Sequence, residues 1–151
     1  MQTFLPYSDF VKSAKVLDWK RLGKQRVEGL TILNILSPDY DKKGWKNHPI
    51  VKMWTGYDDA LKLYTNAMIE EWIKRGYNNT MKIYHVPESV EFPEWIGDNR
   101  LHRSHRMNLL RKDYEHYSRF FKSDVSGDYE NYPYYWATGE LSLLSDLIRP
   151  V

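Results

Sequence analysis

Apolar side chains recur every three or four residues along three long segments, and this spacing constrains the fold more than any other feature of the chain. The segments cover residues 18–36, 57–75 and 98–112. Asp18 and Asp98 stand where helix N-caps belong, and Gly76 stands where a left-handed C-cap belongs. The sequence therefore predicts an all-α fold.

Shorter patterns complete the predicted order of elements. Residues 8–14, 50–54 and 114–121 have helical spacing, whereas residues 81–86 are a short strand candidate. Gly23 and Gly29 weaken the helix over residues 18–36 and favour close approach of another segment there. We expect a single compact domain of about four to five helices with a long irregular C-terminal segment.

Length and composition limit the class of protein. A chain of 151 residues has the size of one domain, so we take residues 1–151 as one domain in which residues 137–151 are a tail. The absence of cysteine excludes disulfides, thiolate nucleophiles and cysteine-based zinc sites, as suits a reducing compartment. No targeting leader and no run of about 18 apolar residues is visible, so we expect a soluble, intracellular monomer.

The positive charge is concentrated in one short segment. The chain has 22 Lys and Arg against 20 Asp and Glu, but residues 100–112 hold five cations and two histidines without an acidic residue. These seven are Arg100, His102, Arg103, His105, Arg106, Arg111 and Lys112. Such a density is typical of a phosphate-binding helix, and arginine suits forked phosphate contacts. A solvated helix face is the alternative interpretation.

A glutamate lies among cations on the first long helix. Arg21, Lys24, Gln25 and Glu28 fall on one stripe at helical spacing. One interpretation is a solvated face with a weak Lys24–Glu28 ion pair. The other is that the cations bind phosphate and keep Glu28 ionised, so that its charge stabilises a positive sugar transition state.

Two further groups carry possible chemistry. His102 and His105 with His116 suggest a metal site, but no carboxylate partner lies between the first two on their helix, so we predict no metal and no cofactor. Histidines in such positions hydrogen-bond phosphate or pack beneath a basic surface. The α-amine of Met1 has the lowest pKa of the chain's amines and becomes a nucleophile if the fold buries it beside a carboxylate.

The sequence resembles the pyrimidine-dimer DNA glycosylase family, which includes the phage UV endonuclease called endonuclease V. The resemblance extends from Met1 to about Trp136. It is carried by residues 1–7 (MQTFLPY), 17–18 with 21–28 (LD and RLGKQRVE), 47–49 (NHP), 74–78 (KRGYN), 102–105 (HRSH), 111–113 (RKD) and 116–117 (HY).

The resemblance implies an all-helical enzyme that flips a nucleotide out of duplex DNA and cleaves the glycosidic bond of a damaged pyrimidine. In the family an N-terminal amine attacks the sugar C1′ and forms an imine, which permits β-elimination of the strand. A glutamate on the first long helix assists, and alignment assigns that role to Glu28. The implied catalytic residues are therefore Glu28 and Met1, in a bacterial or phage-infected cell.

The predicted contacts with double-stranded DNA come from both basic segments. They are Arg21, Lys24 and Arg26 on the first helix, and Arg100, His102, Arg103, His105, Arg106, Arg111 and Lys112 on the basic helix.

The amino terminus departs from the family pattern in one respect. The classical enzyme of the family presents a threonine amine after loss of its initiator, whereas Gln2 is too large for normal methionine removal. Three possibilities follow: Met1 supplies the nucleophile, processing exposes another residue, or activated water hydrolyses the bond without a lyase step.

Three rival functions remain open at the level of sequence. A non-catalytic DNA-binding module would use the basic segment at residues 100–112 without needing Glu28. A metal-dependent nuclease would need His102, His105 and an acidic partner. A glycosylase for another modified base would share the catalytic residues but not the substrate.

Overall fold

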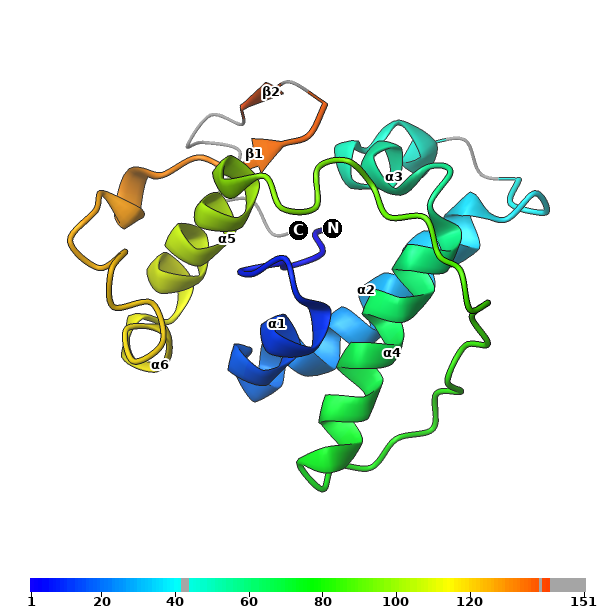
Figure 1. Cartoon of the computed structure of the whole chain (residues 1–151), viewed down its shortest axis with the longest axis horizontal. Helices are drawn as coiled ribbons and strands as arrows, with labels where there is room; N and C mark the ends of the chain where they lie inside the picture. Colours follow the sequence, from blue (N-terminus) through cyan, green and yellow to red (C-terminus); the bar gives the residue numbers. More distant parts are fainter. Residues whose placement is uncertain (42–43, 139, 142–151) are drawn as a thin grey trace.

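The computed structural model describes residues 1–41, 44–138 and 140–141, and these residues form a mainly helical domain (Figure 1). The α-helices are α1 (Phe10–Val16), α2 (Trp19–Leu36), α3 (Pro49–Trp54), α4 (Asp58–Lys74), α5 (Asn99–Lys112) and α6 (Tyr114–Tyr117). Two 3-10 helices, η1 (Gly44–Asn47) and η2 (Tyr129–Asn131), and an antiparallel pair of two-residue strands, β1 (Tyr135–Trp136) and β2 (Glu140–Leu141), complete them. The all-α prediction is confirmed.

The predicted helix ends are also confirmed. A carboxylate oxygen of Asp18 accepts from the backbone N–H of Arg21, and one of Asp98 accepts from that of Arg100, so each aspartate caps its helix. Gly76 follows α4 with a φ of 89°, the left-handed conformation that glycine adopts most readily. Most of the predicted tail at residues 137–151 lies outside the described residues.

Two local predictions are wrong. Residues 81–86 form no strand, because the carboxamide of Asn66 on α4 takes the place of a neighbouring strand. Its Nδ2 donates to the carbonyl of Tyr84 and its Oδ1 accepts from the N–H of the same residue, at 2.9 and 2.8 Å. The helix expected over residues 114–121 ends at Tyr117, beyond which the chain turns and stacks the Phe121 ring on that of Tyr117.

Helices α2 and α4 pack so closely that glycine is required between them. A Cβ atom on Gly29 would lie 2.1 Å from Oγ1 of Thr65, and one on Gly23 would lie 2.9 Å from the Trp72 ring. The close approach predicted from these glycines is confirmed. Gln25 lies on the same buried face of α2, one turn before Gly29.

The amino-terminal segment runs through the middle of the domain. In Figure 1 residues 1–9, in dark blue, pass between the group of α1, α2 and α4 on one side and α5 with α6 on the other. The segment after α4 crosses the molecule to reach α5. None of the described helices is long and apolar enough to span a membrane. The arrangement makes the start of the chain a central element of the fold.

Candidate active site

Side chains from α2, α3 and α4 hold residues 2–4. Gln25 donates from Nε2 to the carbonyl of Gln2 at 3.0 Å and accepts at Oε1 from the N–H of Phe4 at 2.9 Å. The indole N–H of Trp54 donates to Oγ1 of Thr3 at 3.1 Å, and the hydroxyl of Tyr64 lies 2.8 Å from the carbonyl oxygen of Phe4. These partners are buried, so the bonds form in a low-dielectric interior where they fix geometry firmly.

Side chains from α5 hold the next two residues. Nδ1 of His105 accepts from the N–H of Leu5 and Nδ1 of His102 donates to its carbonyl, both at 2.8 Å. Nε2 of His102 accepts from the N–H of Gly97, as expected of a neutral imidazole with one proton. Arg106 donates from Nη1 to the carbonyl of Pro6 at 2.9 Å.

These contacts place His102 and His105 beneath the basic surface, one of the two positions expected for them, rather than on it. Both histidines are almost completely buried, with 3% and 1% of their surface exposed. Burial lowers the pKa of His105 to about 3 and also lowers that of His102, so neither carries the positive charge that a phosphate contact would use. They anchor the amino-terminal segment instead.

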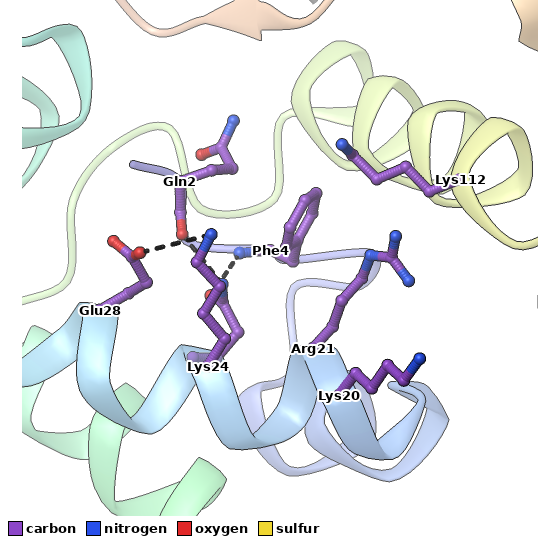
Figure 2. Close-up of a pocket in the computed structure, with 8 residues that line it drawn as sticks. Gln2, Phe4, Lys20, Arg21, Lys24, Glu28 and Lys112 are labelled. Carbon is purple, nitrogen blue, oxygen red and sulfur yellow. Dashed lines mark hydrogen bonds and ion pairs between the residues drawn. The ribbon is translucent and has the colours of Figure 1, made fainter. Parts of the chain in front are cut away.

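A cavity of about 290 Å³ lies beside this anchored segment (Figure 2). It is lined by Gln2 and Phe4 of the amino-terminal segment, by Lys20, Arg21, Lys24, Gln25 and Glu28 of α2, and by Lys112 at the end of α5. Figure 2 shows Lys24 and Glu28 on adjacent turns of α2 and Lys112 across from Arg21. The cavity therefore joins the two basic segments at the start of the chain.

Glu28 is a largely buried carboxylate at this cavity. Its side chain is 12% exposed, its Oε1 lies 4.0 Å from Nζ of Lys24, and its Oε2 is buried without a hydrogen-bond partner among the described residues. Burial raises the pKa of Glu28, while the positive charges of the Met1 amine and of Lys24 partly oppose the rise. The burial of the Glu28 carboxylate argues against the interpretation of Lys24 and Glu28 as a solvated surface pair.

The α-amine of Met1 belongs to the same group of charges. Met1 is 9% exposed, and burial lowers the pKa of its amine below the ordinary value, with Glu28 opposing the shift and Lys24 adding to it. His48, the N-cap of α3, is the fourth member, since burial and then the charge of the amine lower its pKa to about 4. The amine is thus a weaker base than usual and has a carboxylate within electrostatic reach.

Cations crowd the side of the cavity nearest α5. Burial and then the charges of Arg111, Arg21 and Lys24 lower the pKa of Lys112 to about 8. Like charges held this close repel one another, and a bound polyanion would relieve the repulsion. The cavity thus combines the Glu28 carboxylate with a surface suited to phosphate.

The remaining predicted DNA contacts lie in other surroundings. Arg26 donates to the Asn79 side chain and lies 4.2 Å from the centre of the Trp72 ring, and it does not line the cavity. Arg100 pairs with Asp98 at 2.8 Å, and Arg111 donates to Asn108 at 3.0 Å.

Two arginines of α5 share one acidic partner. Arg106 pairs with Asp124 at 2.8 Å, and Arg103 approaches the same carboxylate at 4.0 Å with about half of its side chain exposed. Because Arg106 also holds Pro6, it is committed to internal contacts. Of the cations predicted from α5, Lys112 is the one that lines the cavity.

Other possible metal ligands are not gathered at one place. Within residues 1–41, 44–138 and 140–141, no group of three or more His, Asp or Glu side chains is arranged to hold a metal ion. His116 instead contacts the carbonyl oxygen of Val16 through Nε2 at 2.8 Å.

Sequence reasoning missed four residues that build the site. Gln2, Phe4 and Lys20 line the cavity, and His48 shares its electrostatics with the Met1 amine. The available signal was helical spacing, because Lys20 and Lys24 lie one turn apart on the stripe that carries Glu28. Gln2 and His48 lie in two of the segments that carry the family resemblance, but their place at the site depends on tertiary packing.

A comparison with protein families matches residues 1–85, more than half of the 151 residues, to the family described as pyrimidine dimer DNA glycosylase. The matched part contains Met1, Lys24, Gln25 and Glu28, and it ends before α5. No curated protein and no solved structure matches the chain. The chain belongs to the pyrimidine dimer DNA glycosylase family.

Proposed function

We propose that this protein excises the damaged pyrimidine of a cyclobutane dimer in double-stranded DNA and then cleaves the strand, with the Met1 amine as nucleophile and Glu28 as the catalytic carboxylate. No metal or organic cofactor takes part in this chemistry. The observation that carries the proposal is that Met1 and the Glu28 side chain are both largely buried, 9% and 12% exposed, with the amine and the carboxylate near enough for each charge to act on the other.

The proposed reaction begins with the free amine. The nitrogen lone pair of Met1 bonds to C1′ of the deoxyribose while the C1′–N bond breaks, and the leaving base takes the bonding electron pair and a proton. Ring opening and loss of an amine proton give the imine. Removal of a proton from C2′ then expels the 3′ phosphate and cuts the strand.

Two properties of the site support this sequence of steps. Burial lowers the pKa of the amine, so a larger share is unprotonated and nucleophilic near neutral pH. The sugar gains positive charge as the glycosidic bond breaks, and a preorganised carboxylate such as Glu28 favours that transition state over the ground state.

The anchoring of residues 2–6 supports the same role for Met1. Chain ends usually fray, yet buried side chains from four helices bind this segment. A nucleophile must be held within a fraction of an ångström of its target to gain the full benefit of proximity. The anchoring of residues 2–6 would hold the Met1 amine in the position that nucleophilic attack requires.

The proposed path of the DNA backbone follows the cavity rim. Lys20, Arg21 and Lys112 lie around it and offer cations to consecutive phosphates. Arg103, which is half exposed on α5, extends this surface. We leave Arg106, His102 and His105 out of the path because they are engaged with residues 5 and 6.

Borohydride trapping tests the proposal. The protein, with its amino-terminal residue established by intact mass, is incubated with a duplex that bears one pyrimidine dimer and reduced with borohydride. The expected result is a covalent protein–DNA adduct whose cross-linked peptide begins at Met1. Excision without an adduct would overturn the amine mechanism and favour activated water, whereas absence of excision would overturn the assignment of the substrate.

A further inference from the structure

An amide donor at the cavity has no hydrogen-bond partner. Gln2 is 3% exposed and lines the cavity, and its Nε2 is buried without a partner among the described residues. Leaving a buried donor unsatisfied is unfavourable, and native structures satisfy nearly all such groups. The Gln2 amide is therefore a candidate for contact with a ligand.

The orientation of this amide is determined by its neighbours. Oε1 of Gln2 accepts from the N–H of Thr3 at 3.0 Å, and a flipped amide would set two donors against each other. The main-chain carbonyl of Gln2 is bound by Gln25, which fixes the residue further. No described residue accepts a hydrogen bond from the two N–H groups of Nε2.

The surroundings indicate what kind of acceptor would be bound. The cations that suit phosphate at this cavity are Lys20, Arg21 and Lys112, so a phosphate does not need the Gln2 amide. Gln2 is neutral and sits two residues from Phe4, whose ring also lines the cavity. A neutral donor beside an aromatic ring suits the carbonyl oxygen of a pyrimidine base, since bases are read by hydrogen bonds to their edges together with stacking.

We propose that Gln2 is a specificity-determining residue whose Nε2 donates to a carbonyl oxygen of the damaged pyrimidine. This inference rests on the proposed function. It assigns to the residue next to the nucleophile the task of recognising the base that is about to leave.

The test uses two substrates that differ in the base alone. Both are duplexes of the same sequence, one with a pyrimidine dimer and one with an abasic site at the same position, so the phosphates are retained while the base carbonyls are lost. Single-turnover rates are measured on each with wild type, Gln2→Glu and Gln2→Met. Both replacements are too large to permit methionine removal, and intact mass verifies that Met1 remains.

The two variants separate recognition from folding. Gln2→Glu keeps an oxygen for the Thr3 N–H and replaces the free donor with an acceptor, whereas Gln2→Met removes the donor without adding charge. The matched control is Thr3→Val, which removes the buried hydroxyl bound by Trp54 from the same segment. Thr3 does not line the cavity, so the control disturbs the segment without changing the base contact.

We expect the ratio of dimer excision to abasic-site cleavage to fall about tenfold or more in both Gln2 variants, the effect of about one lost hydrogen bond to a polar group. Thr3→Val should lower both rates by the same factor. Equal losses on both substrates in the Gln2 variants would overturn the inference and reduce Gln2 to a support for Met1. A matching loss of affinity for undamaged duplex would overturn it in favour of a phosphate contact.

The wild-type protein distinguishes this failure from a failure of the proposed function. If wild type excises no dimer, the proposed function is wrong and the inference falls with it. If wild type excises the dimer and the Gln2 variants keep the wild-type ratio, the inference alone is wrong.

Discussion

At the scale of single residues, the site depends on charges that are held away from water. Glu28 and the Met1 amine oppose each other's pKa shift, and burial is the largest cause of both shifts. Lys24 stands between the two roles, because its charge stabilises ionised Glu28 and favours the unprotonated amine. Small changes of charge at this point should therefore alter chemistry more than folding.

Replacing Glu28 with glutamine should separate binding from chemistry. Glutamine keeps the shape of the side chain but not the charge, and loss of one electrostatic group of this kind costs about 10²–10³ in rate. We expect that loss in single-turnover dimer excision, with duplex affinity and the melting temperature close to wild type. Wild-type excision by Glu28→Gln would sink the catalytic assignment, and a lost melting transition would show a structural role.

The pH dependence of trapping should respond in opposite directions to two substitutions. The amine attacks as the free base, so the rate rises with pH through the amine pKa, which burial holds below its ordinary value of 8.0. Glu28→Gln removes a charge that raises this pKa and should move the midpoint to lower pH. Lys24→Met removes a charge that lowers it and should move the midpoint to higher pH.

The measurement is the rate of borohydride trapping on an abasic duplex at saturating protein, which removes differences in affinity. Each variant removes one charge and leaves the other residues of the cavity unchanged, so the two shifts can be compared directly. Midpoints that move in the same direction would show that the amine being titrated is not the one beside Glu28 and Lys24.

At the scale of elements, α2 combines a face that lines the cavity with a face that packs against α4. Glu28 and Lys24 face the cavity, while Gly29 on the next position of the helix faces α4. Because Thr65 of α4 occupies the space that a Cβ on Gly29 would need, α2 is held at a fixed depth. The distance between α2 and α4 therefore determines how close the Glu28 carboxylate lies to the amino terminus.

Gly29→Ala should destabilise the fold through this contact. The added Cβ would lie 2.1 Å from Oγ1 of Thr65, and overpacking of this kind costs about 1–3 kcal/mol in the free energy of unfolding. Urea unfolding measures the loss. Thr65→Ala in the same chain should recover part of it, since that change removes the two outer atoms of the clash.

The matched control for this prediction is Gly44→Ala. A Cβ on Gly44 would meet no atom within 4 Å, so its effect should stay within about 0.5 kcal/mol. If Gly29→Ala were as mild as the control, α2 and α4 would not be packed as closely as described.

Elements were easier to predict from the sequence than contacts between them. Asp18, Asp98 and Gly76 mark helix ends through local hydrogen bonds and local backbone conformation, so a short window of sequence reveals them. The role of Asn66 was not visible, because its carboxamide binds Tyr84 across 18 positions of the chain. A contact between residues so far apart in the chain produces no periodic pattern in the sequence.

The residues of the site also fall into those that local sequence predicts and those that depend on tertiary contacts. Glu28 and Lys24 are one helical turn apart, and the family resemblance adds a role for Glu28, so the sequence alone predicts that both lie at one site. His102 and His105 were assigned to phosphate because their neighbours in sequence are cations, yet they face inward and bind Leu5 about 100 residues away. Composition reports the charge of a helix but not which side of it is buried.

At the scale of the whole molecule, the useful positive charge is gathered from two separate helices. Lys20, Arg21 and Lys24 come from α2 and Lys112 from the end of α5, and they meet around the cavity. The net charge of +2 conveys nothing of this arrangement. Fold topology, rather than overall composition, brings these positive charges together.

The salt dependence of duplex binding should identify the cations that contact phosphate. Each neutralised phosphate contributes about 0.9 to the slope of log affinity against log salt, so a Lys20→Met and Lys112→Met double variant should flatten the slope by about 1.8. The control is Lys62→Met on α4, a lysine paired with Asp59 that does not line the cavity. An unchanged slope in the double variant would mean that DNA binds elsewhere.

The anchoring of the amino-terminal segment has a consequence for synthesis of the protein. The start of the chain leaves the ribosome first, but its partner His105 follows 100 residues after Leu5. Residues 2–4 can bind α2, α3 and α4 once those helices have been made, whereas Leu5 and Pro6 find their partners only when α5 has been made. Anchoring of the amino-terminal segment is therefore completed only when the last of its four anchoring helices has been made.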